Sequence, residues 1–291
     1  KETKSIVMQS KSENAASASG SALTNAAILL TLTLVTMLYA MTVTIANVSL
    51  PQIKGALSAT TDEIALIITF NIIATAVATP MTGWLSTRFG RRNTLVWAVI
   101  GFTVSSFLCG TATSLEQLVF YRFLQGACGA PLPPLCQAIV VDASPKEKIG
   151  QANAIFGMGV VLGPILAPTL GGYLSETYSW RWVFYMMVPC GLASLIGVLI
   201  FIKRHVADKR ADLDWTGFIS LAVAIAAFQF MLDRGERLDW LDNWQIVACA
   251  IAAVTGLYIF ITHSLTSDRP FLNPRLLLKR NYTLGLLIAF I

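Results

Sequence analysis

The chain has 291 residues, of which 55% are hydrophobic and 13% are charged, and its mean hydropathy is +0.65. Soluble domains carry about 25% charged residues, so the composition excludes an ordinary water-soluble protein and indicates an all-α membrane protein with many spans. The net charge of +5 follows the usual excess of Lys and Arg in cytoplasmic loops, and it requires no nucleic-acid partner.

The first 25 residues are polar and rich in Ser and Ala. They lack the short hydrophobic segment and the small-residue cleavage site of a secretory signal peptide. We therefore predict that residues 1–25 form a disordered cytoplasmic tail and that the first apolar segment stays in the protein.

Apolar runs long enough to cross a membrane recur along the rest of the chain. A helix needs about 20 residues to cross a hydrocarbon core about 30 Å thick, and eight runs meet this requirement. They cover residues 26–50, 64–85, 94–110, 117–141, 150–174, 182–202, 215–232 and 244–264. A ninth run opens at residues 281–291 and makes about half a crossing, so we expect further sequence to complete it.

Two longer connections divide the chain. Residues 203–214 separate a six-helix unit at 26–202 from the pair of spans at 215–264, and residues 265–280 precede the ninth run. Of the 21 Lys and Arg residues, 16 lie on the side of the N-terminus, four lie on the other side, and Arg122 lies within a span. This asymmetry predicts a cytoplasmic N-terminus, and it makes both long connections cytoplasmic linkers.

Residue types suited to metal binding or catalysis are scarce in the spans. All five cysteines lie in apolar runs without a C-x-x-C pair or a nearby histidine, so we interpret them as small packing residues. No Asp or Glu falls at the core of a predicted span. We therefore expect no metal, no cofactor and no enzymatic activity.

Arg122, in the segment LVFYRFLQG, is the single charge within a predicted span. An arginine near the centre of a bilayer costs at least about 2.5 to 3.5 kcal/mol, so it normally faces the bundle interior or a water-filled path. The alternative is that the side chain reaches the outer interface from near the helix end. Gln125 on the same helix face, with Gly126 and Gly129 beside it, favours the interior position.

The connection GWLSTRFGRR, between the second and third spans, combines glycines with a cationic cluster. The glycines permit close packing and a tight turn, and the arginines are suited to capping helix carbonyls or pairing with Asp142 at the end of the fourth span. Membrane topology alone also explains three basic residues in such a loop. The residues concerned are Gly83, Arg88, Gly90, Arg91 and Arg92.

The fifth span contains residues that a helix interior disfavours. Proline and glycine there cost about 3 and 1 kcal/mol relative to alanine. The glycines predict a helix surface bare of side chains, and the prolines predict a bend. Such a helix is either a gate that meets another helix or a kinked packing helix of any bundle. The segment GVVLGPILAPTLGG contributes Gly159, Gly163, Pro164, Pro168, Gly171 and Gly172.

Three of these motifs, in this order, resemble those of the major facilitator superfamily. GWLSTRFGRR resembles the signature loop between its second and third helices, LVFYRFLQG its fourth-helix motif, and GVVLGPILAPTLGG its fifth-helix antiporter motif. TVTIANVSLP, WRWVFYMMVPCG and DWTGF are similar to motifs of the drug:proton antiporter family with fourteen spans. The resemblance covers nearly the whole chain after residue 26.

The resemblance implies the helical bundle of that superfamily. Residues 26–202 would be its six-helix N-terminal half, residues 215–264 two inserted spans, and residues 281–291 the start of a C-terminal half. It also implies a proton-coupled exporter of small apolar or cationic compounds, set among the lipids of a bacterial cytoplasmic membrane, with substrate held between the halves. A periplasmic adaptor and an outer-membrane channel are further partners compatible with this resemblance.

The same resemblance suggests where the pathway and the gate lie. The loop from Gly83 to Arg92, with Asp142, would gate the cytoplasmic side, and the fifth helix would meet the C-terminal half. Phe70, Phe156 and Met158 are candidates for loose apolar contacts with ligands, although such residues more often face lipid or the core. The residues assigned to the substrate or coupling pathway are Arg122, Gln125, Asn71 and Asn47.

Four positions depart from the family pattern. Thr42 stands where the first-span motif usually has an acid, Thr87 where the cytoplasmic loop usually has Asp, and Met187 where the sixth-span signature commonly has Asn. Ala167 stands where relatives often have glycine. Without the first-span acid, proton coupling requires a carboxylate from the C-terminal half.

Two further functions stay open at this point. A dedicated exporter of one metabolite or siderophore would carry the same motifs. A non-transporting membrane sensor or scaffold on this fold is the less favoured alternative, because no ordered soluble domain is evident in the sequence.

Overall fold

The computed structural model describes residues 2–203, 212–267, 270–272, 278–280, 283–285 and 287, and side chains from Leu23 onward except that of Leu241. These residues form α-helices and short 3-10 helices, and no strand occurs among them. The fold class is therefore all-α, as the composition indicates.

Eight segments of the described chain are long and apolar enough to cross a membrane, which confirms the predicted number of complete spans. Of the predicted ninth run, residues 283–285 and 287 are helical, and the remainder lies outside the described residues, as does most of the linker at 203–214. The eight segments are Leu23–Ala56, Thr61–Ala78, Arg91–Thr111, Leu115–Ala143, Lys146–Thr177, Arg181–Phe201, Trp215–Arg234 and Trp244–Thr266.

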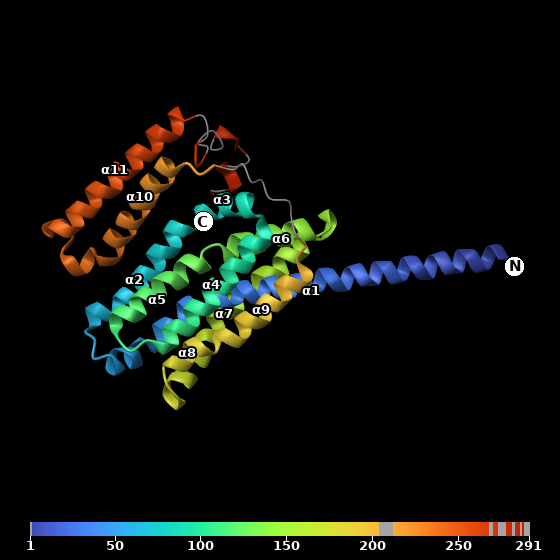
Figure 1. Ribbon diagram of the computed structural model, residues 1–291, viewed down its shortest axis with the longest axis horizontal. Helices are drawn as coiled ribbons and strands as arrows, with labels where there is room; N and C mark the ends of the chain where they lie inside the picture. Colours follow the sequence, from blue (N-terminus) through green and yellow to red (C-terminus); the bar gives the residue numbers. More distant parts are fainter. Residues whose placement is uncertain are drawn as a thin grey trace.

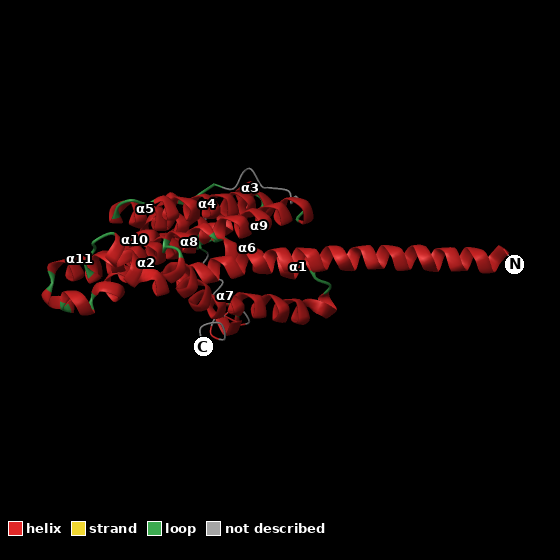
Figure 2. Ribbon diagram, turned by 90° about the horizontal axis from the view of Figure 1, so that it is seen from below, coloured by secondary structure: helices red, strands yellow, loops and turns green. Residues whose placement is uncertain are grey.

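The first helix, α1 (Glu2–Ala56), is longer than its apolar segment. Its N-terminal part extends away from the rest of the molecule (Figures 1 and 2). In this structure residues 2–25 continue the helix of the first span, where the sequence analysis expects a disordered tail. These residues contain no proline, one glycine and several good helix formers, and an existing helix elongates more easily than a new one nucleates.

The predicted second span is interrupted. Helix α2 (Thr61–Ala78) ends before a turn at Thr79 and Pro80, and α3 (Met81–Phe89) follows it. Proline at position 80 has no N–H group with which to continue the helical ladder. Thr60 and Glu63 close the other end of α2 with a reciprocal capping box, which satisfies two backbone donors.

The fourth and sixth spans are also built from two helices each. In the fourth, α5 (Leu115–Gly129) and α6 (Leu132–Ala143) meet at Ala130 and Pro131. In the sixth, α8 (Arg181–Tyr185) and α9 (Met187–Phe201) meet at Met186. By contrast, the third and fifth spans are single helices, α4 (Arg91–Thr111) and α7 (Ile149–Thr177).

The first six spans pack into one bundle around α1. Helix α7 runs along α1 with the most extensive contact of any pair, α4 packs between α5 and α9, and α5 covers α2 (Figure 1). Three apolar clusters fill the bundle, and each includes residues of α1. Cys109 and Cys136 are buried in two of them, which agrees with a packing role.

The two inserted spans form a separate antiparallel pair. Helix α10 (Trp215–Arg234) packs on α11 (Trp244–Thr266) and on α2, and Figure 1 shows the pair beside α2. Arg237 forms an ion pair with Asp62 at 3.1 Å, and the Asp233 carboxylate hydrogen-bonds the Thr69 hydroxyl. These contacts attach the pair to one edge of the bundle.

Candidate functional site

Arg122 lies on α5 inside the six-helix bundle. Its side chain is only 1% exposed, so it does not extend to the outer interface. Nη1 donates to Gln125 Oε1 at 2.6 Å, and the guanidinium carbon lies 5.7 Å from the ring centroid of Phe184 in α8. The structure thus places Arg122 in the interior position that Gln125 favours.

A chain of side-chain hydrogen bonds continues from Arg122 into α4. Gln125 Nε2 donates to Ser106 Oγ at 2.7 Å, and Ser106 in turn donates to the Phe102 carbonyl at 2.7 Å. Ser106 and Phe184 are members of the site that the sequence analysis missed. The pair of serines at 105 and 106, within an otherwise apolar span, was the available signal for Ser106.

Asn71 joins this network through the backbone of α5. Its Nδ2 donates to the Arg122 carbonyl oxygen at 2.7 Å, and Thr75 Oγ1 donates to the Gly126 carbonyl at 3.3 Å. A Cβ atom at Gly126 would lie 3.0 Å from Asn71 Nδ2, so glycine is what permits this approach of α2 and α5. Asn71 therefore positions the helix that carries Arg122 and does not contact the guanidinium.

The network contains no carboxylate among the residues that the structure describes. Arg122 Nε is buried and has no hydrogen-bond partner there. A buried cation without a counter-ion is costly unless its donors are satisfied. The arrangement therefore holds a positive charge and an unused donor inside the bundle, where an anionic group would be strongly stabilised.

The other residues assigned to the pathway lie apart from Arg122. Asn47 is exposed on α1, and its side chain forms no hydrogen bond within the described chain. Phe156 is 7% exposed and belongs to the apolar core between α1, α4 and α7, so its interpretation as a ligand contact is wrong here. Met158 is 61% exposed on α7, and Phe70 is half-buried on α2.

The loop before α4 brings Arg91 and Asp142 together. Arg91 Nη1 forms an ion pair with Asp142 Oδ2 at the end of α6, as the sequence analysis expects. Arg92 Nη2 donates to the Leu199 carbonyl at 2.7 Å, which caps the C-terminal turn of α9. Arg91 and Arg92 therefore do more than mark topology, because they connect α4 to α6 and α9.

The glycines of this loop differ in their roles. Gly90 has a φ of 83°, a conformation that other residues rarely adopt, so the predicted tight turn is present. A Cβ atom at Gly83 would meet no atom of the described chain within 4 Å, so none of the described helices packs closely at Gly83. The Thr87 hydroxyl donates to the Gly83 carbonyl of its own helix, and the start of α4 has no side-chain cap.

The glycines and prolines of α7 separate into two faces. A Cβ atom at Gly163 would lie 2.6 Å from the Met37 carbonyl oxygen, and one at Gly171 would lie 2.6 Å from Ile45 Cγ1. A Cβ atom at Gly159 would likewise clash with the Thr33 side chain. This stripe, with the buried Ala167 one turn after Gly163, packs on α1 of the same bundle.

Pro164, Pro168 and Gly172 form the second face of α7. A Cβ atom at Gly172 would meet nothing within 4 Å, and Pro168 is exposed. The expectation that the whole glycine track meets the other half is therefore corrected: only this second face is open. The close α1–α7 contact needs the small residues of the first face.

No group of three or more His, Cys, Asp or Glu side chains in the described chain is arranged to hold a metal ion. The site is thus a hydrogen-bonded, cationic interior beside apolar helix faces. Such an arrangement suits binding and conformational change.

Comparison with known proteins agrees with this description. Multidrug export protein EmrB of Escherichia coli (strain K12) is 36% identical over 257 residues, which cover 88% of this chain and 50% of that protein. EmrB of Haemophilus influenzae is 38% identical over 89% of this chain and 51% of its own length. Fatty acid resistance protein FarB of Neisseria gonorrhoeae is 38% identical over 83% and 48%. The chain thus spans about half the length of the relatives it matches.

Solved structures share the fold. A D-xylose–proton symporter superposes with a TM-score of 0.51 and 14% identity, over 82% of this chain and 67% of the symporter. A bacterial homologue of the human lysosomal transporter Spinster, in an inward-facing and unoccupied conformation, gives a TM-score of 0.52 and 17% identity, over 83% and 61%. The sequence profile of the Major Facilitator Superfamily matches residues 32–291. The chain belongs to the Major Facilitator Superfamily and is a multi-pass membrane protein.

Proposed function

We propose that this chain is the N-terminal part of a proton-coupled multidrug exporter that works by alternating access. The observation that carries the proposal is the buried Arg122 network, because a charge with an unused donor inside the bundle is expensive to maintain unless it functions. The names of the related proteins, which include multidrug export and fatty acid resistance proteins, support a broad range of apolar substrates.

Arg122 is suited to couple export to proton movement. Its unpartnered Nε favours the ionised form of any carboxylate that approaches it, and such a carboxylate releases its proton more readily. Thr42 occupies the position of the usual first-span acid, so we assign this carboxylate to the C-terminal half. Movement of the halves would then bring the acid to Arg122 and take it away in each cycle.

The open face of α7 and the Arg91–Asp142 ion pair are the proposed gating elements. Pro168 and Gly172 leave a surface that another helix could approach closely, and we assign that helix to the C-terminal half. The Arg91–Asp142 pair holds the α3–α4 loop against α6. Closure of the cytoplasmic side would require the α3–α4 loop to stay against α6.

We place the protein in the bacterial cytoplasmic membrane with its N-terminus inside, because 16 of its 21 Lys and Arg residues then lie in cytoplasmic segments. Helices α10 and α11 are interpreted as the two inserted spans of a fourteen-span exporter. A periplasmic adaptor and an outer-membrane channel remain candidate partners for the whole protein.

Efflux from cells that express the complete gene tests the proposal. We expect wild type to export a fluorescent lipophilic cation or a fluorescent fatty acid, and we expect a protonophore to abolish this export. Arg122→Ala should reduce energised efflux at least about tenfold at equal expression. Arg237→Ala is the matched control, because it removes a guanidinium that is exposed and lies at the outer end of α10.

The outcomes separate the alternatives. A folded protein that exports no member of the panel contradicts multidrug export and favours a carrier of one metabolite or siderophore. Export that survives both the protonophore and Arg122→Ala contradicts the proposed coupling. A protein that moves no substrate but changes the activity of another membrane protein would be a sensor or scaffold.

A further inference from the structure

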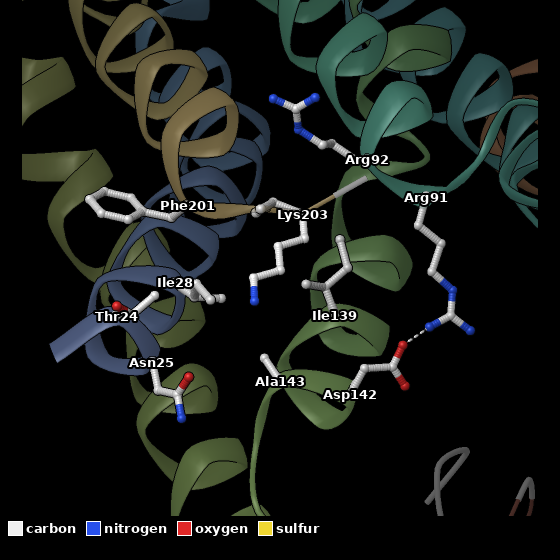
Figure 3. Close-up of a pocket in the computed structure, with 11 residues that line it drawn as sticks. Thr24, Asn25, Ile28, Arg91, Arg92, Ile139, Asp142, Ala143, Phe201 and Lys203 are labelled. Atoms are coloured by element: carbon white, nitrogen blue, oxygen red, sulfur yellow. Dashed lines mark hydrogen bonds and ion pairs between the residues drawn. The ribbon is translucent and has the colours of Figure 1, made fainter. Parts of the chain in front are cut away.

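A cavity of about 440 Å³ opens between the ends of α4, α6 and α9 and the part of α1 where its apolar segment begins, away from the Arg122 network. Figure 3 shows its lining, with basic and apolar side chains around one space. It is also separate from the open face of α7. The residues that line it are Thr24, Asn25, Ile28, Arg91, Arg92, Ile139, Asp142, Ala143, Phe201, Ile202 and Lys203.

Positive charge exceeds negative charge in this cavity. Asp142 neutralises Arg91 through their ion pair, whereas Arg92 and Lys203 have no acidic partner among the described residues. Arg92 gives one hydrogen bond to the Leu199 carbonyl, and its Nε is buried without a partner. Figure 3 shows the Lys203 ammonium between Ile28 and Ile139, directed into the cavity. The site therefore has two uncompensated cations and favours an anion.

The remaining walls are apolar. Ile28 comes from α1, Ile139 from α6, and Phe201 and Ile202 from the end of α9. The ligand must therefore combine a negative charge with hydrocarbon. A small inorganic anion would use only the polar part of this lining.

The cavity lies at the depth of the lipid headgroups. Arg91, Ala143 and Phe201 are the terminal residues of their candidate spans, so the cavity begins where the hydrocarbon core ends. Helices α4 and α9 also carry exposed apolar side chains along their outer faces, including Trp97, Val104, Ile196 and Ile200. These faces offer a surface along which acyl chains could lie next to the cavity.

We propose that this cavity binds the headgroup of an anionic phospholipid. Lys203 would contact the phosphate, Arg92 would add positive charge at the cavity wall, and the acyl chains would lie along α4 and α9. Basic pockets between helices on the cytoplasmic side of membrane proteins bind such headgroups. This site does not depend on the exported substrate, so it can be tested whether or not export is found.

Native mass spectrometry of the purified full-length protein provides the test. The probes are phosphatidylglycerol, which is anionic, phosphatidylcholine, which is zwitterionic, and glycerol 3-phosphate, which has the phosphate without acyl chains. We expect phosphatidylglycerol to bind at least about fivefold more tightly than phosphatidylcholine, because the Lys203 ammonium is directed into the cavity and Arg92 adds positive charge to its wall. Glycerol 3-phosphate should compete only weakly, since it lacks the chains.

Two variants and one control locate the binding. Lys203→Gln should weaken phosphatidylglycerol binding about fivefold, whereas Lys146→Gln, which removes an exposed lysine outside the cavity, should have almost no effect. Ala143→Phe leaves the charge unchanged and fills the cavity, so it should also weaken binding. The melting temperature of each variant shows whether it is folded.

Three results would overturn the inference. Equal weakening by Lys203→Gln and Lys146→Gln would mean diffuse surface attraction. Unchanged lipid binding by a folded Ala143→Phe would place the lipid elsewhere. Glycerol 3-phosphate binding as tightly as phosphatidylglycerol would identify the occupant as a soluble phosphate ester.

Discussion

The hydroxyl of Thr42 on α1 lies 3.8 Å from the sulfur of Met187 on α9. The two side chains are 3% and 1% exposed, and the hydroxyl donates to the Leu38 carbonyl at 2.9 Å. Both positions depart from the usual family pattern, which has an acid at the first and commonly an asparagine at the second. The two departures therefore meet in one weakly polar contact.

We expect Thr42→Asp to destabilise the protein by about 3 kcal/mol or more, because the new carboxylate would be buried next to a thioether that cannot donate a hydrogen bond. The double variant Thr42→Asp with Met187→Asn should recover part of this loss, because the amide can donate to the carboxylate. Thermal unfolding of the detergent-purified protein measures both effects.

Asn47→Asp is the matched control for the added charge, since position 47 on the same helix is exposed. It should destabilise the protein less than Thr42→Asp does, because the new carboxylate is not enclosed by the bundle. If Met187→Asn gave no recovery, the two positions would not be coupled in the way the contact implies.

The two faces of α7 should respond differently to one methyl group. Gly163→Ala puts a Cβ atom 2.6 Å from the Met37 carbonyl oxygen, a backbone atom that cannot move aside alone, so we expect a loss of about 1 to 3 kcal/mol. Gly172→Ala meets open space and should be neutral or stabilising by up to about 1 kcal/mol. Melting temperatures of the two variants, compared at equal expression, test the assignment of the faces.

A further substitution at position 172 tests the gate. A larger residue at position 172 should impair export while leaving the fold intact, because this face is proposed to meet the C-terminal half. Normal export by a folded Gly172→Leu variant would argue against that role.

The Arg91–Asp142 ion pair should matter more for transport than for stability. The two side chains are 39% and 48% exposed, and exposed pairs typically contribute about 0.2 to 1 kcal/mol. Asp142→Asn should therefore shift the melting temperature little but reduce export. The exchange Arg91→Asp with Asp142→Arg should restore part of the export, and a failure of this rescue in a folded protein would exclude a simple charge role.

Asp214, the N-cap of α10, should make the stability of the contacts at this end of α10 depend on pH. Burial raises the pKa of this carboxyl, but hydrogen bonds from the Gly217 and Phe271 N–H groups and from His263 lower it, and its pKa ends below its ordinary value. The folded state thus stabilises the carboxylate form. Asp214 therefore contributes to the free energy of unfolding above the unfolded pKa of about 4, and this contribution is lost as the pH falls through the lower pKa of the folded state.

Asp214→Asn should reduce this dependence. It keeps a side-chain oxygen for the N-cap of α10 but loses the charged interaction with His263, which is 2.8 Å away. Melting temperatures of wild type and the variant should differ at pH 6 and converge below about pH 4. Asp212→Asn, which removes a nearby carboxylate without an ion pair to His263, provides the control.

Hydropathy predicted where the spans lie, but it did not predict which spans are single helices and which are built from two. Hydropathy identifies about 20 apolar residues equally well in a straight helix and in two helices that meet at a bend. The second and fourth spans are interrupted at Pro80 and Pro131, whereas α7 continues as one helix through Pro164 and Pro168. Whether a proline interrupts a helix depends on the neighbours that can satisfy the freed carbonyl groups, which are set by packing.

The sequence by itself determined the number of complete spans, favoured the interior position of Arg122 and offered the pairing of a loop arginine with Asp142 as one alternative. Each of these follows from local chemistry, because the cost of exposing polar groups to lipid acts on every segment separately. Only the tertiary structure decided that Asn71 contacts the backbone of Arg122, that three of the six glycines of α7 face α1, and that Thr42 meets Met187. These contacts join helices far apart in the chain, and the rotation of each helix that creates them depends on all its neighbours at once.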